Sequence, residues 1–145
     1  MSVIKEIYDV AKDSATLATK AAALKRALKA ELKLNKKILT DIGKSAPIDR
    51  ERRLVIIDML EVAELTAAVK YEMPYTAISR KKVTAELAEK HKIKRIVDFD
   101  IETLIEALYL MISYLKKDSK NTQIDLNFRL ININKYNNVL LELLS

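Results

Sequence analysis

The 145-residue sequence contains no cysteine and no tryptophan, and only one histidine, one glycine and two prolines. Without cysteine there is no disulfide, thiolate nucleophile or cysteine metal site, which suits a reducing compartment. The single imidazole, His91, excludes zinc motifs with two histidines and di-iron sites with paired Glu-x-x-His segments. The lone Gly43 excludes nucleotide binding through a glycine-rich loop. Because β-rich proteins need frequent turn residues, and here those are confined to a few places, the composition favours helices.

Long apolar runs are also absent. The longest uncharged stretch, residues 107–115, includes two Tyr and one Ser and is half as long as the roughly 18 residues that a membrane span requires. The N-terminus lacks the pattern of a secretory signal peptide. The lysine-rich face of residues 3–42 is a weak membrane candidate, because the adjoining stripe is largely alanine in its first half. We therefore expect a cytoplasmic protein that does not contact membranes.

Half of the residues are apolar and 32% are charged, which is the balance of a folded globular protein. A chain of this length is one domain by the usual expectation and can bury a core without disulfides or metals. We therefore treat residues 1–145 as a single domain.

The strongest helical pattern covers residues 3–42, which contain neither Gly nor Pro. Apolar residues recur there every three or four positions, and Gly43 is the expected end of the helix. The pattern predicts a rod of roughly 60 Å.

Four further segments follow. Ser45 and Pro47 predict the start of a second helix, which is apolar around most of its circumference from Leu54 to Val69. Met73–Tyr75 ends it, and a shorter helix is expected over 78–91. A clean stripe predicts a helix from 101 to 117, with Asp98 or Asp100 as its N-cap. The last segment is ambiguous: residues 124–130 alternate like a strand but also fit a helical seam, which we favour.

These segments predict an all-α fold, an up-and-down bundle of four long helices plus one short helix, with an unusually long N-terminal helix. The expected second and fourth long helices are too short for either alone to cover a rod of forty residues. Leaving its apolar seam in water would forgo roughly 1.5–3 kcal/mol for each large side chain. Either two shorter helices of the same chain tile along the rod, or a second chain covers the remainder. We favour a homodimer or a helical partner protein along that seam, at Leu24, Leu28, Leu32, Leu39 and Ile42.

The alternative function is nucleic-acid binding by the basic segment 80–95. Its cationic residues are Arg80, Lys81, Lys82, Lys90, Lys92, Lys94 and Arg95. Residues 83–95 resemble the first helix and turn of a helix-turn-helix, in which such side chains neutralise phosphates. The turn lacks the usual Gly, however, and the next helix begins with acidic residues that would repel a nucleic acid. A solvated basic surface is the simpler interpretation.

Catalytic patterns are weak. Asp58, Glu61 and Glu64 share a predicted helix face, which is more simply the solvated strip of a buried helix. Asp98, Asp100 and Glu102 lack the Gly and the distal Glu of a calcium loop. An enzyme would need a cleft that pairs His91 with a carboxylate. We therefore expect no enzymatic activity, no cofactor and no small-molecule substrate.

Overall fold

A computed structural model describes residues 17–41, 49–71 and 73–145. Over these ranges the fold is all-α, as the sequence predicts, and extended pairing is limited to one antiparallel bridge between Lys82 and Asp100. The helical elements are α2 (Leu17–Ile38), η1 (Leu39–Asp41), α3 (Arg50–Met59), α4 (Ala63–Lys70), α5 (Tyr75–Ile78), α6 (Ala85–Lys90), η2 (Lys94–Ile96), α7 (Ile101–Asp118) and α8 (Leu126–Leu143), where η denotes a 3-10 helix.

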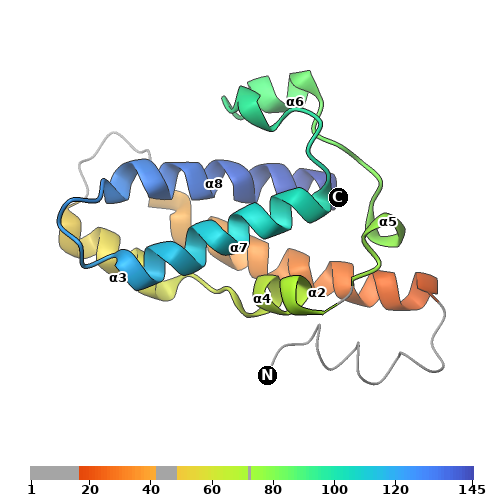
Figure 1. Cartoon of the computed structure of the whole chain (residues 1–145), viewed down its shortest axis with the longest axis horizontal. Helices are drawn as coiled ribbons and strands as arrows, with labels where there is room; N and C mark the ends of the chain where they lie inside the picture. The colour runs from red at the N-terminus through yellow and green to blue at the C-terminus, as the bar shows by residue number, and fades with distance from the viewer. Residues whose placement is uncertain (1–16, 42–48, 72) are drawn as a thin grey trace.

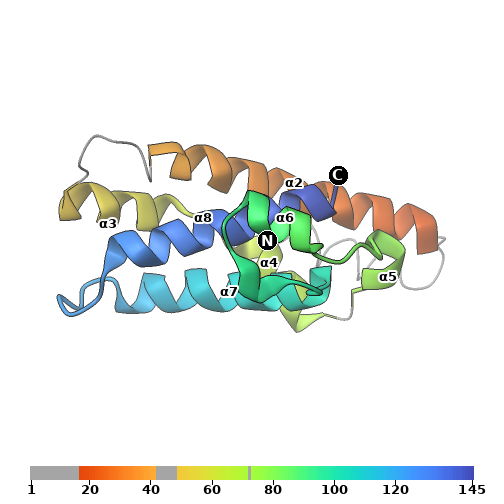
Figure 2. The ribbon, with the colours of Figure 1, turned by 90° about the horizontal axis from the view of Figure 1, so that it is seen from above.

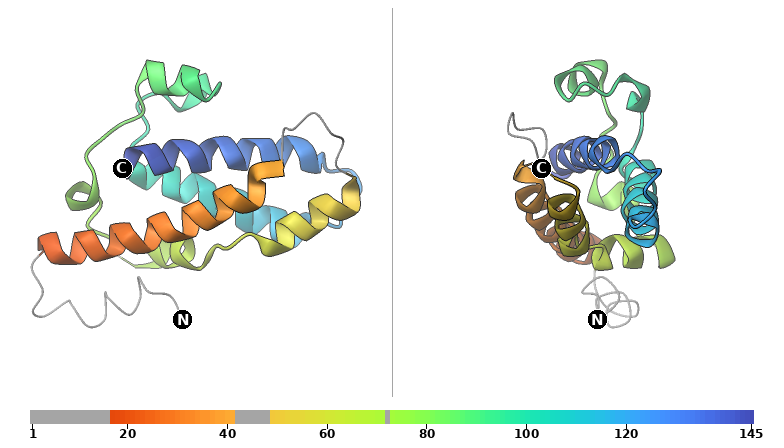
Figure 3. Two further views of the ribbon diagram at one scale, coloured as in Figure 1. Left: turned by 180° about the vertical axis from the view of Figure 1, so that it is seen from behind. Right: turned by 90° about the vertical axis from the view of Figure 1, so that its left-hand side faces the viewer.

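The bundle is built around the α7–α8 hairpin. α2 packs against α8 and α4, and α4 packs against α7, so that these helices enclose one core (Figures 1 and 2). α3 packs against α7 and α8, and its first residue, Arg50, donates a hydrogen bond to the Ser119 carbonyl at the C-terminal end of α7. The segment that contains α6 and η2 lies outside the bundle, above the C-terminal end of α8 (Figure 3). In the described residues three helices are long, and α3 and α4 together take the place of the fourth.

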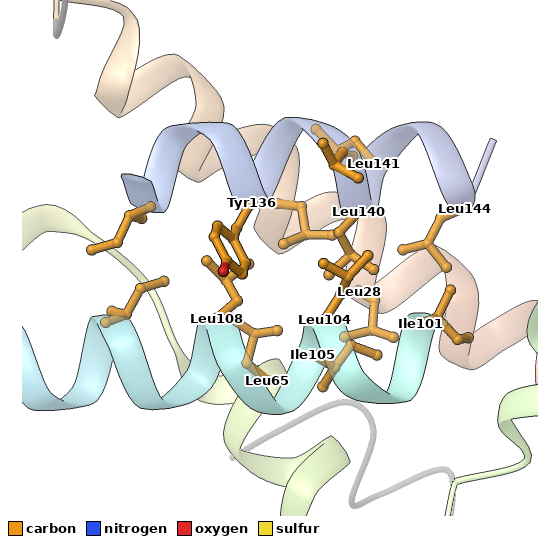
Figure 4. Packing of buried hydrophobic residues seen from close by; sticks show 14 of the residues in the cluster. Leu28, Leu65, Ile101, Leu104, Ile105, Leu108, Tyr136, Leu140, Leu141 and Leu144 are labelled. Carbon is orange, nitrogen blue, oxygen red and sulfur yellow. The ribbon is translucent and has the colours of Figure 1, made fainter. Parts of the chain in front are cut away.

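The core consists of apolar side chains from α2, α3, α4, α7 and α8, and Figure 4 shows how α7, α8, α2 and α4 contribute to it. The predicted stripe of α7 is confirmed: Ile101, Leu104 and Leu108 are at most 1% exposed, and Ile105, Ile112 and Leu115 are fully buried. The start of this helix is also as predicted, because the Asp100 carboxylate accepts a hydrogen bond from the Thr103 amide at 2.9 Å. That bond lowers the pKa of Asp100.

The ambiguous last segment is a helix, so the strand alternative is wrong. Asp125 is its N-cap and accepts a hydrogen bond from the Phe128 amide at 3.0 Å. The helical seam predicts burial correctly at Leu130, Ile133 and Leu140, whereas Phe128 is 60% exposed. Local capping and a helical spacing of buried residues therefore outweigh the short alternation.

The N-terminal helix can be followed from Leu17, the first described residue, to the 3-10 turn at Leu39–Asp41. The predicted rod therefore falls partly outside the described residues, as do the expected stop at Gly43 and the expected cap at Ser45. α3 has its own cap, because Asp49 accepts a hydrogen bond from the Arg52 amide at 2.8 Å.

A break between α3 and α4 corrects the prediction of one helix across residues 54–69. Neither Gly nor Pro lies at the break. Instead, α2 supplies hydrogen-bond partners for the interrupted backbone. The Asn35 amide group donates to the Glu61 carbonyl at 2.7 Å and accepts from the Glu61 amide at 2.8 Å. The Glu31 carboxylate accepts the amides of Glu64 and Leu65, both at 2.9 Å, and so caps α4 from another helix.

The ionisation of Glu31 makes the stability of the protein depend on pH at this cap. Burial raises the pKa of Glu31 above its ordinary value of 4.5, against the effect of its two backbone hydrogen bonds. The unfolded chain therefore loses this proton first, and ionisation of Glu31 lowers the free energy of unfolding as pH rises through its folded pKa. Glu31→Gln is expected to remove that part of the decline, whereas Glu89→Gln, at an exposed glutamate of α6, retains it. Urea unfolding at about pH 4 and about pH 7 measures the difference, and equal declines in all three proteins would contradict this assignment.

Candidate functional site

The predicted interface on the N-terminal helix is corrected by burial within the single chain. Leu24 is 1% exposed, and Leu28, Leu32 and Leu39 are fully buried. α8, α5 and α4 pack against α2. The side-chain amide of Asn137 in α8 donates a hydrogen bond to the backbone carbonyl of Leu32 at 2.9 Å. These four leucines therefore belong to the hydrophobic core of the single chain and not to an exposed interface. The difference in length between the N-terminal helix and its neighbours no longer requires a partner protein there. Ile42 lies outside the described residues.

The basic segment folds as a small closed cap rather than as a helix-turn-helix. α6 ends at His91, after which Lys92 adopts a left-handed conformation with φ of 56°. The Ile93 amide then donates to the Ala88 carbonyl at 2.9 Å, which completes a helix-ending turn that commonly uses Gly. Only the three-residue η2 follows, so no recognition helix is formed in this part of the chain.

Backbone pairing closes the cap at its base. The Val83 amide donates to the Phe99 carbonyl at 2.9 Å, and the Asp98 amide donates to the Val83 carbonyl at 2.8 Å. Val83, Ala88 and Ile96 are buried. The cap therefore has a fixed shape and a small apolar interior.

Two side chains at the end of α6 fasten the cap to α8. Lys90 pairs with Glu142 at 2.6 Å, and His91 contacts the other oxygen of the same carboxylate. The hydrogen bonds to Lys90, first, and to His91 lower the pKa of Glu142. His91 is 17% exposed at its side chain. The pairing of His91 with a carboxylate that an enzyme would need is thus present, although the same bonds serve as a structural clamp.

The seven predicted phosphate contacts do not form one surface. Lys90 is engaged by Glu142, and Lys81 donates to the Ser145 carbonyl at 2.8 Å. Arg95 donates to the Tyr136 hydroxyl at 3.2 Å on another side of α8. All seven residues are exposed, including the remaining four, Arg80, Lys82, Lys92 and Lys94.

A hollow of about 580 Å³ lies on the outer face of the α7–α8 hairpin. From α7 it is lined by Ala107, Leu110, Met111 and Tyr114, and from α8 by Arg129, Asn132, Ile133 and Tyr136, with Arg95 reaching in from η2. Each helix contributes four residues at spacings of three, four and seven, which is one helical face. Ile133 and Tyr136 are buried, whereas Leu110 and Tyr114 are each 62% exposed. The hollow is therefore an apolar groove open to solvent.

An arginine lies over a tyrosine at each end of this groove. Arg95 lies 5.7 Å from the ring centre of Tyr136, and Arg129 lies 5.8 Å from that of Tyr114. Both distances suit cation–π contacts. None of the described lining residues carries a carboxylate, so the groove offers an apolar floor between two positive charges.

Sequence reasoning missed this groove because it recorded only the core stripe of α7. The available signal was the second apolar row, in which Leu110 and Tyr114 lie off that stripe and leave large side chains without a place in the core. The matching row on α8 was hidden by the strand-like alternation near its start.

The other sequence candidates do not assemble into a site. The helix is interrupted at residues 60–62, so Asp58 in α3 and Glu64 in α4 lie on different helices and the predicted single acidic face does not form. Across residues 17–41, 49–71 and 73–145, no three His, Cys, Asp or Glu side chains are grouped to hold a metal ion. No helix in the described ranges is long and apolar enough to cross a membrane.

The chain matches no protein family model, and no curated protein or solved structure shows significant similarity to it.

Proposed function

We propose that the protein is a non-enzymatic interaction protein that binds an amphipathic helix of a partner protein in the α7–α8 groove. The observation that carries this proposal is the pair of matched helical faces, in which Leu110 and Tyr114 stay largely exposed. A third helix laid between two others buries side chains at the same spacings of three, four and seven. The two rows thus match the pattern that such a ligand presents.

The dimensions of the groove favour a helix over a small molecule. Its lining spans residues 107–114 of α7, which corresponds to roughly 10 Å or two helical turns. A small-molecule pocket usually encloses most of its ligand. Here Leu110 and Tyr114 on the α7 side are each 62% exposed, and this shape suits a broader ligand that lies along the surface.

The arginines define the charge of that ligand. Arg95 and Arg129 flank the floor at opposite ends, and the described residues that line the space between them include no acidic side chain. A complementary helix carries two acidic residues about seven positions apart, since seven residues rise by roughly 10 Å, with large apolar residues between them. The proposed partner therefore presents an acidic, amphipathic helical segment.

A labelled synthetic helix tests the proposal. The probe carries two glutamates two turns apart on either side of a leucine pair, and its matched control carries lysines instead of the glutamates. We expect fluorescence anisotropy to show saturable binding of the acidic probe and binding at least about tenfold weaker for the basic one. Leu110→Asp is expected to abolish binding, because it places a carboxylate on the apolar floor.

The double variant Arg95→Ala/Arg129→Ala is expected to weaken the acidic probe about tenfold, while the exposed Arg80→Ala leaves it unchanged. Circular dichroism confirms that each variant is folded. Equal binding of both probes, or an unchanged affinity in Leu110→Asp, would refute the groove as the docking site. Concentration-dependent self-association that Leu110→Asp abolishes would identify a second copy as the occupant and overturn the foreign partner.

We also propose a cytoplasmic location, which the absence of cysteine supports. Self-association through the N-terminal helix is not proposed again, because its leucines are buried within the chain.

A further inference from the structure

We infer that a second groove, between α2 and the corner formed by α6 and α8, binds the phosphate backbone of double-stranded nucleic acid. This basic groove is lined by Lys25, Arg26, Lys29, Lys33, Lys36 and Lys90. It is separate from the α7–α8 groove and is independent of the function proposed above.

Two adjoining hollows form the basic groove. The described lining of the first, of about 380 Å³, comes from α2, and that of the second, of about 460 Å³, comes from α2, α6 and the C-terminal end of α8. Both are lined by Lys29 and Lys33, so they adjoin each other at these two side chains. Together they extend from Ala22 to Lys36 along α2, a length of roughly 20 Å.

The lysines lie on one side of α2 because of their spacing. Lys25, Lys29 and Lys33 are each four residues apart, and Lys36 follows three residues later, so all four project to one face. None of the four forms an ion pair with another residue in the described part of the chain. The one acidic residue of α2, Glu31, is buried and bonded to the start of α4.

The fold joins two basic blocks that are distant in the sequence. Lys90 and His91 come from the cap and face the lysines of α2 across the second hollow. Among the described lining residues, Glu142 is the one acidic side chain, and it is already paired with Lys90 and His91. The groove therefore keeps a large excess of positive charge, which attracts a polyanion.

The uncharged lining residues decide the type of polyanion. Among the described residues they are mainly small or polar, such as Ala22, Ala30 and Asn138, and none of the described lining residues is aromatic. A membrane surface would require exposed apolar side chains for insertion. An acidic protein would require a buried anchor residue. Single strands rely on aromatic stacking of their bases. A duplex presents its phosphates outwards and needs none of these, and without base contacts its binding does not depend on sequence.

Binding of a labelled mixed-sequence DNA duplex tests the inference. We expect anisotropy to show binding that weakens steeply with salt, and Lys29→Glu/Lys33→Glu to lower the affinity at least about 100-fold at low salt. The slope of log K against log salt should become shallower by about 2 in that variant, one contact for each lysine. The control is Lys117→Glu/Lys120→Glu, which makes the same change in net charge at exposed lysines near the α7–α8 loop.

Four results would overturn the inference. The first is no binding of the duplex at low salt, and the second is an equal loss of affinity in the control variant, which would indicate net charge alone. The third is tighter binding of the matching single strand. The fourth is displacement of the duplex by polyglutamate or by phosphatidylserine vesicles at equal charge, which would indicate an acidic protein or a lipid surface. Binding of the acidic helical probe should be unchanged in Lys29→Glu/Lys33→Glu, because the two grooves are lined by different residues.

Discussion

Leu28→Ala is expected to lower the free energy of unfolding by about 3–4 kcal/mol. Leu28 is fully buried at the centre of the core, and Figure 4 places it among side chains of α7 and α8. Truncation removes apolar contacts and leaves a cavity that long helices on either side cannot easily close. Urea unfolding followed by circular dichroism at 222 nm, the standard helix signal, measures the loss as a lower midpoint with an unchanged slope.

Leu34→Ala is the matched control, since Leu34 lies on the same helix but is 49% exposed. It is expected to cost less than about 1 kcal/mol. Leu28→Asp should prevent folding altogether, because it buries an unpaired charge in a chain of marginal stability. If Leu28→Asp remained folded and lost only an oligomeric state, the assignment of this face to the monomer core would be refuted.

The periodicity of the sequence was sufficient to predict the apolar faces and insufficient to predict what covers them. Leu28 and Leu32 are on the buried stripe of α2, as their spacing requires. Whether a stripe meets its own chain or a partner depends on how the remaining helices are placed. Each predicted helix is too short by itself to cover the N-terminal helix, but α8, α5 and α4 all pack against α2. Tiling by two helices was the alternative left open, and the structure contains it.

Long-range hydrogen bonds explain most of what the sequence could not predict. The break before α4 depends on side chains 26 to 34 residues away, so no local turn signal marks it. The turn after α6 forms with Lys92 in a left-handed conformation, where the sequence argument expected Gly. Both grooves follow from tertiary placement as well, because each combines residues from helices that are separate in the chain. Caps made by neighbouring residues, such as Asp100 and Asp125, were predictable by comparison.

Asn35→Ala is expected to lower the free energy of unfolding by about 2–4 kcal/mol. Asn35 is fully buried, and its side-chain amide satisfies both the amide and the carbonyl of Glu61 at the break between α3 and α4. Removing it leaves two backbone groups without partners and opens a small cavity, so the cost exceeds that of one ordinary hydrogen bond.

A conservative variant separates these contributions to the role of Asn35. Asn35→Asp keeps an oxygen that accepts the Glu61 amide but loses the donor to the Glu61 carbonyl and adds a buried charge. We expect Asn35→Asp to be destabilised strongly at neutral pH and to recover part of its stability in acid, where protonation removes the charge and restores a donor. The exposed neighbour Lys36→Ala should change stability by less than about 0.5 kcal/mol. Urea midpoints at both pH values measure these effects. If Asn35→Ala lowered the stability no more than Lys36→Ala, the proposed role of Asn35 at the break between α3 and α4 would be wrong. The hydrogen bonds from Glu31 to the start of α4 would then be the ones that stabilise the break.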